Sequence, residues 1–143
     1  MIDSANTKCN TRRSRYLAPK LWFAAAAVWY GIICILSQIP GREIAEMPFR
    51  IWDKGAHFAV YGVLGFFVCG ALRLRGGRPL VALAFTAAIA AVLGGLDEVH
   101  QMFVPGRCPG LDDATADLIG GIFGGIIALA VLYRPLSALE QNP

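Results

Sequence analysis

The sequence predicts an all-α membrane protein with four transmembrane helices. Of its 143 residues, 56% are hydrophobic and only 16% are charged, whereas an average soluble domain has roughly 25% charged residues. The mean hydropathy is +0.53. The apolar residues form four long runs, each long enough to cross a hydrocarbon core of about 30 Å at about 1.5 Å per helical residue. We therefore expect one polytopic membrane domain.

The first apolar run follows a polar, basic segment, residues 1–20. This segment contains five basic residues and a single acid, Asp3. Because no apolar stripe at helical spacing is present, we expect a disordered tail. The first transmembrane helix is expected over residues 21–39. No A-x-A-like cleavage motif follows this run, which favours an uncleaved anchor over a signal peptide.

A mixed segment, residues 41–52, follows the first run. Charged and apolar residues are interspersed in it, and Pro40 and Pro48 prevent a long helix. Trp52 is suited to the membrane interface, where tryptophan is enriched. We expect this segment to lie in the headgroup layer.

Three further transmembrane helices are expected over residues 54–72, 80–101 and 113–133. A glycine-rich basic turn, residues 73–78, leads to Pro79, which is suited to the first turn of a helix. A loop over residues 102–111 precedes the last helix. The expected organisation is thus a cytoplasmic tail (1–20), a four-helix membrane domain (21–136) and a short C-terminal tail (137–143).

The distribution of charge predicts that both termini are cytoplasmic. With this orientation, nine of the thirteen basic residues lie inside, as the positive-inside rule requires. Eight of the ten acidic residues lie at the outer end of the helices. The net charge is only +3. A nucleic-acid-binding protein needs a basic face on a soluble fold, which this sequence does not offer, so nucleic acid is not an expected partner.

The same topology separates the four cysteines. Cys9 is expected in the cytoplasm, Cys34 and Cys69 within the membrane, and Cys108 outside. A disulfide needs Cα atoms within roughly 7 Å, so no bridge is expected. There is no CxxC motif, and zinc or redox chemistry is not indicated.

Polar residues from three helices are expected to meet at the outer end of the bundle. Residues 53, 57 and 61 share one helical face, as do 97 and 101, and 113 and 117. Ionisable groups at the edge of hydrocarbon are costly unless paired and are therefore functional candidates. The candidate site residues are Asp53, Lys54, His57, Tyr61, Asp97, Glu98, Gln101, Arg107, Asp113 and Asp117.

Four of these candidates carry groups suited to acid–base catalysis: Asp97, Glu98, His57 and Asp113. Lys54 and Arg107 are suited to phosphate oxygens, and the other candidates are expected to bind the ligand. Each also has a structural interpretation when taken alone. A buried histidine, an interfacial tyrosine and an acid in the first turn of a helix are all common. The adjacent acids Asp97 and Glu98 fit a structural role least well, because they repel each other and need a nearby cation. We expect Arg107 to pair with one of them.

The last helix also carries a packing signal. Gly120 and Gly124, and Gly121 and Gly125, form two overlapping GxxxG pairs, which let another helix approach closely in a membrane. We expect this helix to pack against the second and third through these glycines.

Three motifs in order resemble the VanZ-like family. They are Asp53-Lys54-x-x-His57-Phe58-x-x-Tyr61, Asp97-Glu98-x-His100-Gln101-x-Phe103-x-Pro105-Gly106-Arg107, and Asp113-x-x-x-Asp117-x-x-Gly120. The resemblance covers residues 21–133; position 117 is commonly Asn in that pattern and is Asp here. It implies a small multi-pass protein of the bacterial cytoplasmic membrane. The founding member of the family is associated with teicoplanin resistance, and the resemblance implies no settled activity.

Three classes of function are compatible with the residues. The first is an envelope enzyme that acts on a lipid-linked substrate. The second is a non-catalytic protein that binds membrane lipid, a lipid-linked envelope precursor or a lipoglycopeptide antibiotic. The third is proton or ion coupling, which four short helices suit least. The acids and His57 could also hold a divalent cation, but their spacing matches no known metal motif, and the cofactor and oligomeric state stay open.

Overall fold

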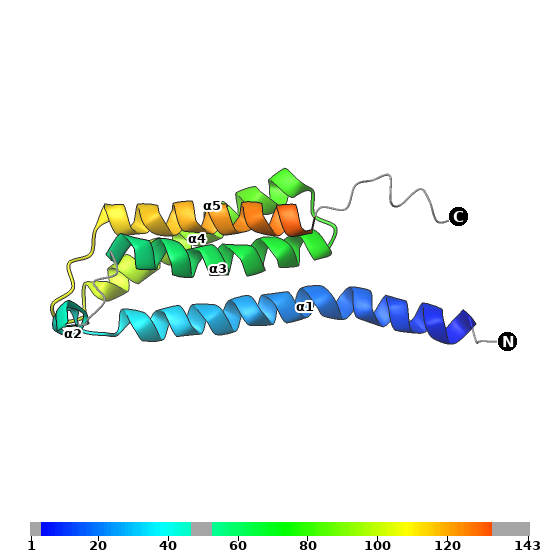
Figure 1. Ribbon diagram of the computed structural model, residues 1–143, viewed down its shortest axis with the longest axis horizontal. Helices are drawn as coiled ribbons and strands as arrows, with labels where there is room; N and C mark the ends of the chain where they lie inside the picture. Colours follow the sequence, from blue (N-terminus) through cyan, green and yellow to red (C-terminus); the bar gives the residue numbers. More distant parts are fainter. Residues whose placement is uncertain (1–3, 47–52, 133–143) are drawn as a thin grey trace.

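The chain forms an antiparallel bundle of four long helices and one short one. The structure is a computed structural model that describes the backbone of residues 4–46 and 53–132, and the side chains of residues 18–43 and 54–132. No strand is found among these residues. In chain order the helices are α1 (Ser4–Ser37), α2 (Gly41–Glu46), α3 (Asp53–Leu74), α4 (Pro79–Gln101) and α5 (Leu111–Val131). Figure 1 shows the four long helices side by side, with α2 at one end of the bundle.

Four segments are long and apolar enough to cross a membrane, which confirms the predicted fold class. They are Ala18–Ser37, Lys54–Leu74, Pro79–Gln101 and Leu111–Val131. The beginning of α1 and the end of α5 lie at the same end of the bundle (Figure 1), as an even number of crossings requires. Which side of the membrane this end faces stays a prediction.

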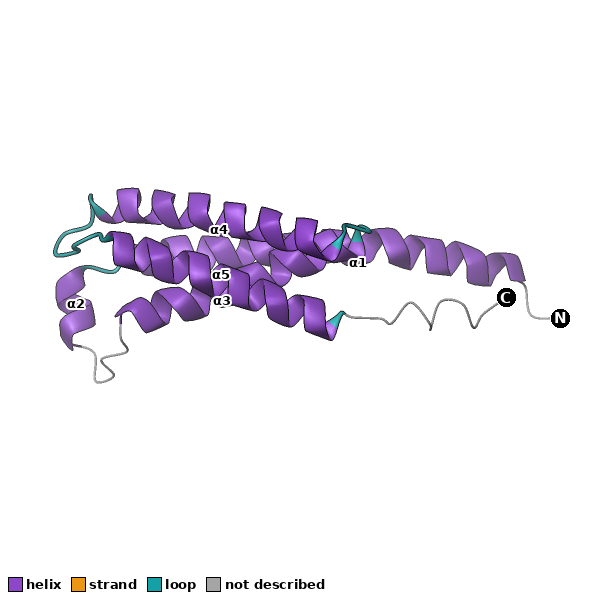
Figure 2. Cartoon of the chain, turned by 90° about the horizontal axis from the view of Figure 1, so that it is seen from above, coloured by secondary structure: helices purple, strands orange, loops and turns teal. Residues whose placement is uncertain are grey.

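Helix α1 is longer than the sequence indicated. It begins at Ser4, so the expectation of a disordered segment over residues 1–20 is wrong from residue 4 onward. The physical reason is that the first turn of a helix is costly to form. Each residue added afterwards gains one hydrogen bond, and only its own φ and ψ angles must be fixed. The apolar part of α1 supplies the nucleus, and the polar residues extend it. This polar half projects beyond the other helices in both views (Figures 1 and 2).

Helix α3 is the centre of the bundle and packs against α1, α4 and, most extensively, α5. Glycines make the α3–α5 approach possible. A Cβ atom on Gly65 would overlap the backbone of Gly121, and one on Gly124 would overlap the backbone of Gly62. The prediction that the α5 glycines lie at the helix contact is therefore confirmed.

Helix α1 packs on the other side of α3 through aromatic side chains. The indole N–H of Trp29 donates a hydrogen bond to the carbonyl of Val60, with 2.8 Å between the heavy atoms. Trp22 lies against Phe66 and Phe67, with ring centroids 5.2 and 5.9 Å away. Large amphipathic rings of this kind combine a broad apolar contact with a satisfied polar group.

Two Pro-Gly turns meet at the end of the bundle where α2 lies. The backbone N–H of Gly41 donates to the carbonyl of Pro105 at 3.2 Å. A Cβ atom on Gly41 would collide with the carbonyl of Gly106, whose φ of +77° also favours glycine. The α4–α5 loop is thereby attached to the end of α1. Trp52, expected in the headgroup layer, lies outside the described residues.

The described cysteines agree with the predicted absence of disulfides. Cys34, Cys69 and Cys108 are free, and Cys108 is exposed. The side chain of Cys9 lies outside the described part of α1.

Candidate functional site

A histidine–aspartate pair links α3 to α5 at the end of the bundle where α2 lies. The Nδ1 atom of His57 lies 2.9 Å from Oδ1 of Asp117. The side chains are 8% and 0% exposed. Because an ionised carboxylate can only accept hydrogen bonds, an ionised Asp117 requires a proton on Nδ1. The pair then fixes the orientation of the ring and makes Nε2 its basic nitrogen.

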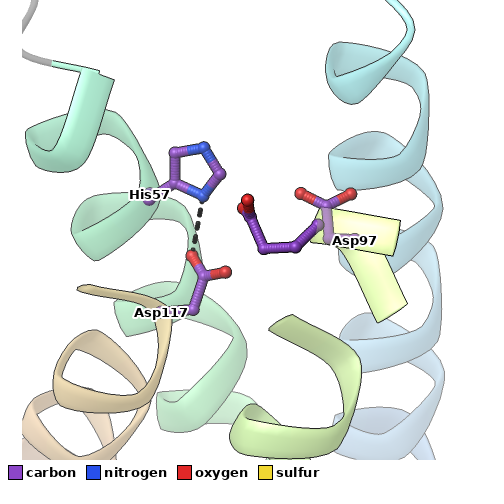
Figure 3. Close-up of side chains that lie close together, drawn as sticks. His57, Asp97 and Asp117 are labelled. Carbon is purple, nitrogen blue, oxygen red and sulfur yellow. Dashed lines mark hydrogen bonds and ion pairs between the residues drawn. The ribbon is translucent and has the colours of Figure 1, made fainter. Parts of the chain in front are cut away.

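Two adjacent acids of α4 face this pair. Asp97 accepts a hydrogen bond at Oδ2 from the side-chain amide of Gln101, 3.0 Å away. Glu98 accepts one at Oε2 from the backbone N–H of Gly110, 2.7 Å away. Asp97 is 4% exposed and Glu98 9%. Figure 3 shows His57 and Asp117 on one side of the site and Asp97 opposite them.

These four side chains form a compact group, which we call the acidic cluster: His57, Asp97, Glu98 and Asp117. One nitrogen or oxygen atom from each residue lies within 4.8 Å of those from the other three. Three helices contribute to it. Its members are separated by up to 60 positions in the chain, so the packing of the bundle brings them together.

Three hydrogen bonds to the cluster acids come from groups without a fixed positive charge. The donors are the side-chain amide of Gln101, the backbone N–H of Gly110 and the imidazole of His57. Oε1 of Glu98 and Oδ2 of Asp117 are buried and accept no hydrogen bond from any described residue. Such oxygens are costly in a buried site.

Two further predicted residues border the cluster. Asp113 is 7% exposed and lies close enough to Glu98 and Asp117 to interact with them electrostatically. Tyr61 is fully buried and interacts in the same way with Asp117 and Asp97. Its hydroxyl has no hydrogen-bond partner among the described residues.

The predicted cationic residues lie outside the cluster. Lys54 forms an ion pair with Asp112, and both side chains are more than half exposed. The Nε atom of Arg107 donates to the carbonyl of Ile39 at 3.2 Å. The pairing of Arg107 with Asp97 or Glu98 stays a prediction. Asp53 is the first residue of α3, and its side chain is outside the described part of the structure.

Three residues of the site were not identified from the sequence. Gly94 lies against Asp117, where a Cβ atom would come within 2.8 Å of Oδ2. Gly110 contributes only its backbone N–H, which a side-chain motif does not reveal. Tyr30 of α1 lies near Asp97; its position depends on helix packing. Gly94 carried a usable signal, since a glycine inside an apolar helix indicates a close approach.

An apolar groove lies on the outer side of α3 and α5. It has a volume of about 280 Å³ and begins at Phe58, the residue after His57. The rings of Phe58 and Phe123 lie 5.4 Å apart at this end. The groove continues past Val63 and Phe66 to Ile127. Its lining is suited to a hydrocarbon chain and offers no polar group for specific recognition.

Chemically, the cluster combines an oriented imidazole with several carboxyl groups. An imidazole held by a carboxylate is the arrangement by which a histidine acts as a general base. Carboxyl groups in different environments can divide the acid and base roles between them. The same atoms are also ligands for a divalent cation.

Comparison with known proteins identifies the family of the chain. The sequence matches the model of the family described as VanZ/LLP1 over residues 7–133. Neither curated proteins nor solved structures give a match.

Proposed function

The chain belongs to the VanZ/LLP1 family, and we propose that it is an enzyme of the bacterial cytoplasmic membrane that acts on a lipid-linked substrate of the cell envelope. The observation that carries the proposal is the buried His57–Asp117 pair opposite two further acids. A purely structural bundle gains little from burying three carboxyl groups together, because each loses solvation and they repel one another.

The proposed reaction is hydrolysis or group transfer at the headgroup of the lipid. His57, oriented by Asp117, accepts the proton of the attacking water or hydroxyl group. Asp97 or Glu98 gives a proton to the leaving oxygen. Asp113 stabilises the positive charge that His57 carries once it has accepted a proton. Lys54 and Arg107, at the exposed border of the site, are proposed to bind phosphate oxygens. By altering a lipid-linked precursor, the protein would contribute to resistance to teicoplanin-type glycopeptides.

The apolar groove favours a second candidate function, which is binding without catalysis. A groove of about 280 Å³ along α3 and α5 is suited to the acyl chain of a membrane lipid or of a lipoglycopeptide. In that case the cluster recognises the headgroup and the protein changes the access of the ligand to its target. A binder predicts graded losses of affinity when single cluster residues are changed, whereas an enzyme predicts complete loss of conversion.

The experiment is mass spectrometry of the lipids that copurify with the protein. Wild type is compared with an Asp97→Asn/Glu98→Gln double variant and with Glu43→Gln, a control at an exposed acid of α2 outside the cluster. We expect one lipid class to be enriched with wild type and the control, and lost with the double variant. Identical lipid profiles in all three proteins would contradict the proposal. A parallel test of teicoplanin sensitivity in cells that express each variant examines the proposed role in resistance.

A further inference from the structure

We infer that the acidic cluster is the binding site of one divalent transition-metal ion, held by His57, Asp97, Glu98 and Asp117. The inference deepens the proposed function. The catalytic role of the metal rests on that proposal. Its first support is geometric. The four donor atoms lie within 4.8 Å of one another. Ligands on opposite sides of one ion are roughly 4.2 Å apart, since metal–ligand distances are about 2.1 Å. Small side-chain movements therefore suffice to bring all four to one ion.

The unsatisfied oxygens are a second, independent observation. Asp117 is fully buried and Glu98 is 9% exposed, yet one oxygen of each accepts no hydrogen bond from the described residues. A buried polar atom without a partner is a signal that a ligand, an ion or a proton occupies the site. Both atoms belong to residues of the cluster.

The charge of the group favours a cation. Three carboxyl groups lie together, and the donors from Gln101, Gly110 and His57 carry no fixed positive charge. A divalent ion would offset most of the repulsion between them. Proton sharing between the acids and His57 is the alternative, and the absence of stoichiometric metal binding would favour it.

The donor types indicate the class of metal. Carboxylates alone favour Mg²⁺ or Ca²⁺, whereas an imidazole nitrogen among them favours Mn²⁺, Fe²⁺ or Zn²⁺. Asp117 either binds the ion directly or stays hydrogen-bonded to His57 and orients that ligand. Such an ion would act as a Lewis acid and activate the attacking water, so in the metal-bound protein it would replace the proton-transfer roles of His57, Asp97 and Glu98.

The test is Mn²⁺ binding to the detergent-purified, chelator-treated protein, measured by electron paramagnetic resonance. We expect one Mn²⁺ per chain in wild type, with a pulsed-resonance signal from an imidazole nitrogen. Glu98→Gln and His57→Gln should bind at least about tenfold more weakly, and His57→Gln should lose the nitrogen signal. Asp112→Asn changes an exposed acid in the first turn of α5 that is not part of the cluster, and this variant should bind Mn²⁺ like wild type.

Two results would overturn the inference. One is the absence of stoichiometric Mn²⁺ or Zn²⁺ binding to folded wild-type protein. The other is unchanged affinity in Glu98→Gln. If a variant fails to fold by circular dichroism, the nitrogen signal of wild type still decides the question. Stoichiometric metal binding without any lipid conversion would remove the proposed function and leave the metal site in place. Lipid conversion by a wild-type protein that binds no metal would remove the metal site and leave the proposed function in place.

Discussion

At the scale of single residues, the contact between Gly94 and Asp117 positions the His57–Asp117 pair. A Cβ atom on Gly94 would come within 2.9 Å of the Asp117 Cβ atom. Asp117 is fully buried, so neither residue can move away freely. The glycine thus allows a carboxyl group to lie between α4 and α5 where an alanine would displace it.

This contact predicts opposite effects for two adjacent glycines. Gly94→Ala should lower the free energy of unfolding by about 1–3 kcal/mol through overpacking. Gly95→Ala has open space around its Cβ atom and should be neutral or up to about 1 kcal/mol stabilising, because alanine favours the helix. Thermal unfolding in detergent measures both. Equal melting temperatures for the two variants would show that Asp117 adjusts without cost.

The hydrogen bond of Arg107 is expected to hold the α4–α5 loop in place. Its Nε–H donates to the carbonyl of Ile39 at the end of α1, and lysine has no equivalent planar donor group. We expect Arg107→Lys to impair function nearly as much as Arg107→Ala. In both variants amide hydrogen exchange should accelerate across residues 102–110. Wild-type exchange in Arg107→Lys would mean that charge alone holds the loop.

The residues of the cluster illustrate what a sequence can and cannot predict. The i, i+4 spacing predicted that Gln101 lies beside Asp97, and the structure places their hydrogen bond at 3.0 Å. The partner of Glu98 is the backbone N–H of Gly110, and no residue type encodes that contact. The pairing of Lys54 with Asp112 was equally hidden, because it depends on how the ends of α3 and α5 meet.

At the scale of helices, the glycine faces of α3 and α5 determine the position of the site. Backbone contact along Gly62, Gly65, Gly120 and Gly124 brings the two helices together without large side chains between them. His57 and Asp117 stand one turn from these contacts. Widening the α3–α5 distance would therefore separate the pair.

Gly121→Leu tests how closely α5 packs against α4. A side chain at this position meets Ala90 of α4, so overpacking should destabilise the bundle by about 1–3 kcal/mol. The matched control is Gly31→Leu on α1, where a Cβ atom meets nothing within 4 Å. Thermal unfolding of the two proteins in detergent gives the comparison. A Gly121→Leu protein that melts with the control would place this glycine face toward lipid.

Helix boundaries were predicted correctly from the sequence where a proline or a cluster of polar residues marks the end of a helix. Pro79 begins α4, and the predicted end at Gln101 is the observed one. The predicted first transmembrane span, residues 21–39, overlaps the observed apolar segment Ala18–Ser37, but α1 itself begins at Ser4, inside the segment that was predicted to be disordered. No proline or glycine precedes Pro19 in that segment, and polarity alone does not stop a helix that an apolar segment has nucleated.

At the scale of the whole molecule, the orientation in the membrane determines which compartment the acidic cluster faces. The acidic cluster and the exposed Cys108 belong to the end of the bundle opposite the start of α1. With the predicted cytoplasmic termini, this end faces outward. The basic residues before the first apolar run support that orientation.

Cysteine labelling tests the orientation. An impermeant maleimide applied to intact cells should modify a protein that retains only Cys108 and spare one that retains only Cys9. The reason is that the predicted orientation places Cys108 outside and the start of α1, with Cys9, in the cytoplasm. Labelling of Cys9 alone would move the cluster to the cytoplasmic side and exclude an outer-leaflet substrate.

The central claim is that the acidic cluster performs chemistry on a lipid-linked substrate. It is tested most directly by reconstituting the protein in liposomes with envelope lipid extract and following lipid conversion by mass spectrometry. Wild type and Glu43→Gln, a change at an exposed acid of α2, should convert one lipid class, and Glu98→Gln, with an unchanged melting temperature, should convert none. Equal conversion by wild type and a correctly folded Glu98→Gln protein would contradict the account.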